Sequence, residues 1–157
     1  MRAKFRKMFI CMLVVIMSLT SVHIDSLAAS KKSYTKSDLR YLTAIIYCES
    51  GNQSYKGKVA VANVVLNRVN SSKYPNTIKK VIYQKWQFTP ARSGSLAKAL
   101  KLYDKNSSKL SQSKKAAKAA LNGKYVLKKK YLSFTGYTKK LARKHTNHQK
   151  IGAHIFF

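Results

Sequence analysis

Acidic residues and cysteines are what this sequence has least of. Its 157 residues include 32 Lys and Arg but only four Asp and Glu, which gives a formal net charge of +28, and Glu49 is the only glutamate. Of the two cysteines, Cys11 falls in an N-terminal apolar run, so Cys48 stands alone in the rest of the chain and no intrachain disulfide is expected there. The core alone must hold the fold, and a hydrophobic content of 45% is sufficient for one and argues against disorder.

The first 29 residues have the layout of a secretory signal peptide. Basic side chains up to Lys7 precede an apolar run from Met8 to Leu19, and small residues at 26–29 offer cleavage sites. The run is shorter than the roughly 20 residues that a membrane-spanning helix needs, although an uncleaved N-terminal anchor is the alternative. We expect residues 30–37 to form a short polar leader and residues 38–157 to form a single domain.

Export changes what the positive charge implies. A very basic chain first suggests nucleic acid as its partner, but the abundant polyanions outside a bacterial cell belong to the cell wall. Peptide-stem carboxylates and teichoic phosphates would concentrate a cationic protein at that surface in a salt-dependent way. The simpler alternative is that the lysines keep the protein soluble. We expect an extracytoplasmic monomer with the wall as its partner and with no nucleic-acid or membrane partner.

Hydrophobic periodicity predicts an α+β fold that is mostly helical, with a small antiparallel sheet in its C-terminal part. Helices are predicted at residues 38–49 (capped by Ser37), 58–69, 78–83, 96–103 and 113–121 (capped by Ser113), with an irregular loop at 84–95. Alternating residues predict a strand at 131–135, Gly136 predicts a turn, and the apolar stretch 151–157 predicts a terminal strand. Residues 138–150 are predicted to be irregular.

Glu49 is the strongest candidate for a catalytic group. It continues the apolar helical row of Leu39, Leu42 and Ile46 rather than lying on a charged face. A carboxyl group placed there is partly desolvated, which should raise its pKa. A carboxylic acid that is still protonated near neutral pH is what cleavage of a glycosidic bond requires. The alternative is an ion pair with one of the many lysines, which would depress the pKa.

Six sequence blocks together resemble a known family. They are YCESGN at 47–52, GKVAVANVVLNRV at 57–69, YPNTI at 74–78, VIY at 81–83, QFTP at 87–90 and IGAHIF at 151–156. In this order they are similar to the SleB-type cell wall hydrolase family of spore cortex-lytic enzymes, and the Glu-Ser pair resembles lytic transglycosylases with a goose-type lysozyme core. The resemblance implies a lysozyme-like domain that cleaves peptidoglycan, in the spore cortex during germination or in vegetative wall remodelling.

The sequence departs from that family pattern at three places. Gln53 replaces the family's second glutamate, which leaves the proposed acid in place but removes a neighbouring charge. Lys128, Lys129 and Lys130 stand where the family commonly has a Gly-Gly-Ala turn, so one wall of the cleft should differ in shape. The third departure is that no wall-binding repeat precedes the predicted domain.

The shortage of acids favours a mechanism with one carboxyl group. Asp38 should lie roughly 16 Å from Glu49 along the helix, beyond the ~5–9.5 Å that separates paired catalytic carboxylates, and Asp104 lies in a polar stretch that is typical of a surface. Lytic transglycosylation, which the resemblance also implies, needs one acid and no cofactor, because the muramic acid 6-hydroxyl is the nucleophile. Hydrolysis of the same bond, as by a muramidase, is the alternative.

Amide, hydroxyl and aromatic side chains suit the binding of sugar rings. On that ground we expect the substrate cleft to contain Gln87, Phe88, Thr89, Ser133, Tyr137 and His154. The alternative for Phe88 and Tyr137 is a place in the core, and Gln87 could instead cap a helix.

Three other functions are compatible with the residue types. Cys48 with a histidine would make a cysteine peptidase, but a reactive thiolate is favoured at a helix N-terminus and Cys48 is predicted near a C-terminus. His145, His148 and His154 could bind zinc, yet their surroundings are strongly basic and lack cysteine or carboxylate ligands, so no metal is expected. A basic wall-binding or nucleic-acid-binding module without catalytic activity is the third alternative.

Overall fold

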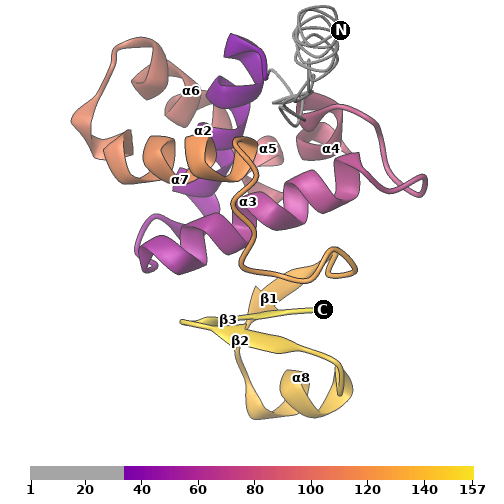
Figure 1. Cartoon of the computed structure of the whole chain (residues 1–157). Coiled ribbons are helices and arrows are strands. Elements are labelled where there is room, and N and C mark those ends of the chain that lie inside the picture. Colours follow the sequence, from indigo (N-terminus) through magenta and orange to yellow (C-terminus); the bar gives the residue numbers. More distant parts are fainter. Residues whose placement is uncertain (1–33) are drawn as a thin grey trace, which may run out of the picture. The chain divides into compact units, whose positions relative to one another are not determined.

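The computed structural model describes residues 34–157, in which a set of helices is followed by a small sheet (Figure 1). The predicted signal peptide and half of the predicted leader, residues 30–33, lie outside the described residues, whereas Lys36 and Ser37 of that leader already belong to the first described helix. The helices are α2 (Lys36–Ser50), α3 (Tyr55–Val69), α4 (Ile78–Tyr83), α5 (Thr89–Arg92), α6 (Ser95–Asp104), the 3-10 turn η1 (Ser108–Leu110), α7 (Ser111–Leu121) and α8 (Lys139–Lys144). Within residues 34–157 no helix has the length and apolar character needed to cross a membrane.

Helix α2 is the centre of the helical part and contacts α3, α4, α6 and α7. It buries the row Leu42, Ile45 and Ile46 completely, while α3 is buried nearly all round, as its sequence predicted. The prediction that Ser37 caps α2 is wrong. The cap is Thr35, because the Thr35 hydroxyl accepts from the Asp38 backbone N–H at 3.0 Å while the Asp38 carboxylate accepts from the Thr35 backbone N–H at 3.0 Å.

A ladder of polar side chains on α3 fixes the irregular segment between α7 and the sheet. Asn63 accepts from the Val126 backbone N–H at 2.8 Å and donates to the Lys124 carbonyl at 3.0 Å. Asn67 donates to the carbonyls of Lys128 and Tyr131, at 3.1 and 2.9 Å, and Arg68 donates to that of Leu132 at 2.6 Å. The segment has no regular secondary structure, so these side chains replace the backbone partners that a helix or strand would provide.

The sheet has three short antiparallel strands, β1 (Phe134–Gly136), β2 (Gln149–Ile151) and β3 (His154–Phe156), in the order β1-β3-β2. The C-terminal residues therefore form a hairpin rather than one strand over 151–157. Gly152 makes the tight turn possible, because it has a φ of 59°. The predicted strand at 131–135 was also displaced: β1 begins at Phe134, and Gly136 belongs to it and faces His154 on β3.

Three helical predictions needed correction. Helix α5 lies in the predicted loop 84–95 and begins at Thr89 with Pro90 in its first turn, a position where the missing N–H costs nothing. Helix α8 lies in the predicted irregular stretch, where the Thr138 hydroxyl caps it by accepting from the Leu141 N–H at 3.1 Å. Ser113 does not cap α7, because the helix begins at Ser111 and Ser113 is buried within it.

Candidate active site

Glu49 lies in the last turn of α2 and faces a groove of about 930 Å³. Helix α2 and the loop after it form one wall, and α5 and α6 form the other. We call this cavity the Glu49 groove; it is lined by Tyr47, Cys48, Glu49, Gly51, Asn52, Thr89, Pro90, Ser93, Ser95, Lys98, Ala99 and Leu102. Hydroxyl and amide groups line the groove together with one carboxyl group and one lysine, which suits a hydroxyl-rich ligand.

The surroundings of Glu49 favour its protonated form. The residue is half-buried, and burial raises the pKa of its carboxyl group. In the described part of the chain Glu49 forms no salt bridge, so the alternative of an ion pair with a lysine is contradicted there. Asp104 shows the opposite case: its carboxylate accepts from Arg40 at 2.6 Å on the surface, and that hydrogen bond lowers its pKa.

No second carboxyl group of the described residues shares this groove. Asp38 is occupied in the cap of α2, roughly 16 Å from Glu49 along the helix axis at 1.5 Å per residue. Asp104 is held by Arg40, and neither aspartate lines the groove. The site can therefore offer one protonatable acid, as the sequence predicted, and cannot offer the carboxylate pair of an ordinary glycosidase.

Two interactions hold the chain on either side of Glu49. The Ser50 hydroxyl donates to the Ile46 carbonyl at 2.8 Å inside the last turn of α2. The Lys58 ammonium group, on a residue that is 6% exposed, donates to the carbonyl of Gly51 at 2.9 Å and to that of Gln53. Sequence reasoning missed the role of Lys58. The sequence offered no signal for it, because both acceptors are backbone carbonyls.

Gln53 connects the loop after Glu49 to the C-terminal hairpin. Its side-chain oxygen accepts from the Ala153 backbone N–H at 3.0 Å, and its side-chain nitrogen donates to the Asn52 side chain at 3.0 Å. A glutamate could accept from Ala153 but, when ionised, could not donate to Asn52. A Cβ atom at Gly152 would lie 2.5 Å from the Gln53 oxygen, so this connection also requires glycine at position 152.

Of the six residues expected to bind substrate, Thr89 lines the Glu49 groove. Its neighbour Phe88 is 3% exposed, with its ring 5.1 Å from the Arg68 guanidinium, and therefore belongs to the core. Gln87 is exposed and does not line the groove. The QFT block thus contributes one side chain to the groove, and the alternative of a core position holds for Phe88.

The other three residues belong to the sheet region. Ser133 pairs its backbone with that of Phe157, at 2.9 and 3.0 Å, and the half-buried His154 packs edge-on against Phe134. Tyr137 is 38% exposed, and the Lys150 ammonium lies 3.7 Å from the centre of its ring. None of them lines the Glu49 groove, so their contact with substrate stays a prediction.

The alternative catalytic groups lack the required geometry. Cys48 lines the Glu49 groove, but burial, with a contribution from Glu49, raises the pKa of its thiol to about 11, which disfavours the nucleophilic thiolate. His145 stacks on Phe157 with ring centres 3.6 Å apart, whereas His154 packs on β1. Among residues 34–157 no three His, Cys, Asp or Glu side chains come together as a metal site.

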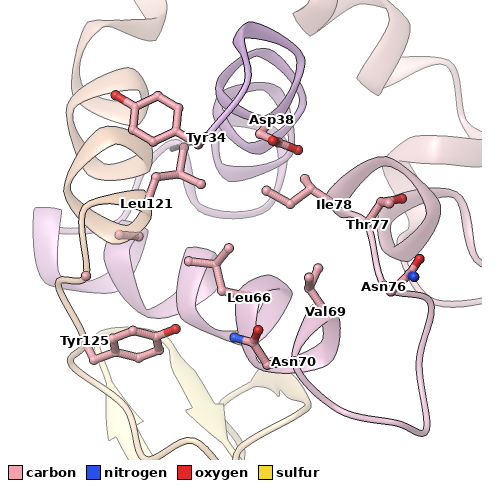
Figure 2. Close-up of a pocket in the computed structure, with 12 residues that line it drawn as sticks. Tyr34, Asp38, Leu66, Val69, Asn70, Asn76, Thr77, Ile78, Leu121 and Tyr125 are labelled. Carbon is pink, nitrogen blue, oxygen red and sulfur yellow. The ribbon is translucent and has the colours of Figure 1, made fainter. Parts of the chain in front are cut away.

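A separate cavity of about 360 Å³ lies between α2, α3, α4 and α7 (Figure 2). The apolar side chains of Leu66, Val69 and Ile78 point into it, and Tyr34 and Tyr125 stand at its edge. Its one acidic side chain is Asp38, which is already engaged with Thr35. This cavity shares no residue with the Glu49 groove and offers no acid for catalysis.

The sequence profile of the Cell Wall Hydrolase family matches residues 52–157. The chain belongs to this family. Glu49 lies just before the matched segment, so the match does not test its role. The spore cortex-lytic enzyme of Bacillus cereus is 40% identical over 63 residues, and that of Bacillus subtilis is 36% identical over 73 residues; these matches cover 40% and 46% of this chain. Each covers 24% of the relative, so the chain matches about a quarter of the length of these curated relatives.

Two solved structures share the fold. The catalytic domain of the germination-specific lytic transglycosylase SleB from Bacillus anthracis is 30% identical, with a TM-score of 0.64 over 80% of this chain and 97% of that domain. The catalytic domain of Bacillus cereus SleB is also 30% identical, with a TM-score of 0.61 over 80% of this chain and 92% of that domain. The predicted resemblance to the SleB type and the mostly helical α+β fold are both confirmed.

Proposed function

We propose that this cell wall hydrolase cleaves the glycan strands of peptidoglycan, between N-acetylmuramic acid and N-acetylglucosamine, as a lytic transglycosylase with Glu49 as acid and base. One observation carries the proposal: Glu49 is a half-buried carboxyl group with a raised pKa, alone among the acids of the described residues in lining a large groove. Membership of the cell wall hydrolase family and the likeness to SleB catalytic domains support the substrate class.

The reaction divides into two proton transfers at the same carboxyl group. Protonated Glu49 gives its proton to the bridging oxygen, the bond from that oxygen to muramic acid C1 breaks, and the N-acetylglucosamine side leaves as an alcohol. The muramic acid 6-hydroxyl then bonds to C1 and loses its proton to the Glu49 carboxylate. This closes a 1,6-anhydro ring and restores the protonated acid, so no water is consumed.

The groove favours this route over hydrolysis because a second base is missing. Glycoside hydrolases ordinarily use a second carboxylate to activate water or to act as nucleophile, and no other carboxyl group of the described residues lines the groove. The hydroxyls of Thr89, Ser93 and Ser95 are too weakly basic to replace it. An intramolecular nucleophile removes the need, since the reacting hydroxyl is already held beside C1.

The site of action follows from the same relatives. Spore cortex-lytic enzymes are this chain's curated relatives, so we propose action on the spore cortex or on the cell wall, outside the cytoplasm. We further propose that residues 1–29 direct export, that residues 38–157 form the catalytic domain, and that the domain acts as a monomer. The positive charge would hold the protein on the anionic wall.

Digestion of purified sacculi by the wild type and by a Glu49→Gln variant tests the proposal. The wild type should release soluble muropeptides, and the variant should release none while still sedimenting with the insoluble wall. Asp104→Asn, which removes a carboxylate outside the groove, is the matched control and should retain activity. Release of free stem peptides in place of muropeptides would contradict glycan cleavage.

A further inference from the structure

A second groove, of about 670 Å³, lies at the opposite end of α3 from the loop that follows Glu49. We call it the lysine groove; its wall includes Lys73, Lys129 and Lys130 together with Asn67, Asn70 and Ser71. Tyr55, at the start of α3, and Asn67 are roughly 18 Å apart along the helix axis at 1.5 Å per residue. The lysine groove shares no residue with the Glu49 groove, so it is a separate site.

The three lysines of this groove carry uncompensated charge. All three are exposed, and within residues 34–157 none of them forms a salt bridge. The acids of that part of the chain lie elsewhere: Asp104 pairs with Arg40, Asp38 closes the cap of α2, and Glu49 lines the other groove. Three like charges around one cavity repel one another, and an anion bound between them would relieve that repulsion.

Asn67 has a buried side-chain oxygen without a hydrogen-bond partner among residues 34–157. The residue is 3% exposed, and its side-chain nitrogen donates to the carbonyls of Lys128 and Tyr131, which fixes the orientation of the amide. A buried acceptor of this kind is costly when left unpaired. A ligand that fits the groove should therefore bring a slim hydrogen-bond donor beside its negative charge.

We propose that the lysine groove binds the acidic peptide stem of peptidoglycan, with stem carboxylates on Lys73, Lys129 and Lys130 and a stem amide N–H directed to the Asn67 oxygen. A peptide stem carries both groups within a few bonds. A polyol phosphate also carries negative charge and hydroxyl donors, but it has no methyl side groups to place in the apolar cavity that adjoins the lysine groove. This inference rests on the proposed function, since it places the side chain of the same polymer whose glycan enters the Glu49 groove.

The neighbouring cavity supports a peptide of some length. Asn70 and Tyr125 line both the lysine groove and the apolar cavity of Figure 2, so the two adjoin at these residues. An extended stem that places its carboxylates among the lysines can lay the methyl groups of its alanines toward Leu66 and Val69. A charged end next to an apolar end matches a peptide better than it matches a uniformly charged polymer.

Titration of the ¹⁵N-labelled protein with a sugar-free stem peptide, alanyl-γ-glutamyl-diaminopimelate, tests the inference by NMR. We expect the Asn67 side-chain amide and the backbone amides near residues 70–73 and 129–132 to shift. The same peptide with every carboxylate amidated should bind at least tenfold more weakly. The double variant Lys129→Gln/Lys130→Gln should lose roughly tenfold in affinity, because each exposed ion pair is worth up to about a fivefold change.

The matched control is the double variant Lys139→Gln/Lys140→Gln, which removes the same charge from two exposed lysines at the start of α8, outside the groove. It should bind the peptide as the wild type does. Equal weakening by the two double variants, or equal binding of the acidic and amidated peptides, would overturn the proposal. The proposal would also be overturned if poly(glycerol phosphate) shifted the amide signals of the lysine groove and the peptide did not.

The test separates this inference from the proposed function. A Glu49→Gln variant should lose glycan cleavage and keep the affinity for the stem peptide. If the wild type failed to cleave glycan but bound the peptide in the lysine groove, the proposed function would fail and the groove assignment would stand. The reverse result, cleavage without peptide binding, would remove the groove assignment alone.

Discussion

The two grooves near opposite ends of α3 use charge in opposite ways. In the Glu49 groove one carboxyl group stands half-buried among hydroxyls, amides and apolar atoms, and no cation pairs with it among the described residues. In the lysine groove three cations stand in the open without a carboxylate. A chain with a formal charge of +28 thus keeps its one glutamate unpaired. Burial tunes an acid for chemistry, whereas exposed charge attracts a polymer.

Removal of the acid should have the largest effect. Glu49→Gln keeps the size and hydrogen bonding of the side chain but removes its titratable proton, so we expect kcat for glycan cleavage to fall roughly 10²- to 10⁴-fold. Steady-state rates on soluble glycan fragments would measure this. Because the lysine groove is separate, the stem-peptide affinity should be unchanged. A variant that lost both properties together would break the comparison between the grooves.

Asn63→Leu should destabilise the wall of the lysine groove. The change removes the partners of the Lys124 carbonyl and the Val126 N–H, which lie in the irregular segment that leads to Lys129 and Lys130. Two backbone groups left unpaired should lower the free energy of unfolding by about 2–4 kcal/mol, measured by urea denaturation. Ser54→Ala, at the cap of α3, should cost about 1 kcal/mol. If Asn63→Leu lowered the free energy of unfolding no more than Ser54→Ala does, the stabilising role of the polar ladder on α3 would be contradicted.

The pH dependence of stability should reveal the cost of burying the acid. Below the ordinary glutamate pKa of about 4.3, Glu49 is protonated in the folded and unfolded states, so Glu49→Gln should leave the free energy of unfolding unchanged. Burial raises the folded-state pKa, so as pH rises through that value the wild type pays for a buried charge and loses stability. The variant should become the more stable protein there.

Urea denaturation at several pH values from 4 to 8 checks this expectation, with Asp104→Asn as the control. That variant should be less stable than the wild type by a nearly constant amount over this range, because Arg40 lowers the pKa of Asp104 and the wild type loses this stabilisation only below the ordinary aspartate pKa of about 3.9. If Glu49→Gln were the less stable protein at pH 8, a favourable charge interaction of Glu49 would be indicated and the account of its burial would be wrong.

The smallest effect is expected at Lys98, the one lysine that lines the Glu49 groove. It is exposed and forms no ion pair among the described residues. Its ammonium group can therefore pair with a carboxylate of the peptide stem next to the cleaved glycosidic bond. Lys98→Gln should raise KM about two- to fivefold on stem-bearing glycan, and leave kcat nearly unchanged. Lys101→Gln, on the same helix but outside the groove, is the control. Equal effects of the two changes would indicate general charge attraction.

The helical part of the fold could be predicted because its signals are local. Apolar residues recur at helical spacing in α2, α3, α4, α6 and α7, and their burial in the structure follows that pattern. The sheet was harder because each strand has three residues, too few for a period of two to be visible. The hairpin between β2 and β3 depends on Gly152 and on the contact from Gln53, which lies far away in the sequence.

The candidate site could likewise be predicted only where its signal is local in the sequence. Glu49 could be selected from the sequence because it is a lone acid at the end of an apolar row, and the structure gives it the expected burial. The groove opposite it could not be predicted, since Ser93, which follows α5, and Ser95 and Lys98 on α6 reach it through tertiary packing alone. Lys58 was missed for the same reason: its partners are backbone carbonyls, which have no signature in the sequence.

The central claim is that one carboxyl group cleaves the glycan with the substrate's own hydroxyl as nucleophile. The most direct test is the mass of the new muramic acid ends released from purified sacculi, measured after borohydride reduction. The account predicts ends that are one water lighter than a reducing end and that resist reduction, as a 1,6-anhydro ring must. Reducible ends, each carrying an added water, would show hydrolysis and contradict the single-acid mechanism.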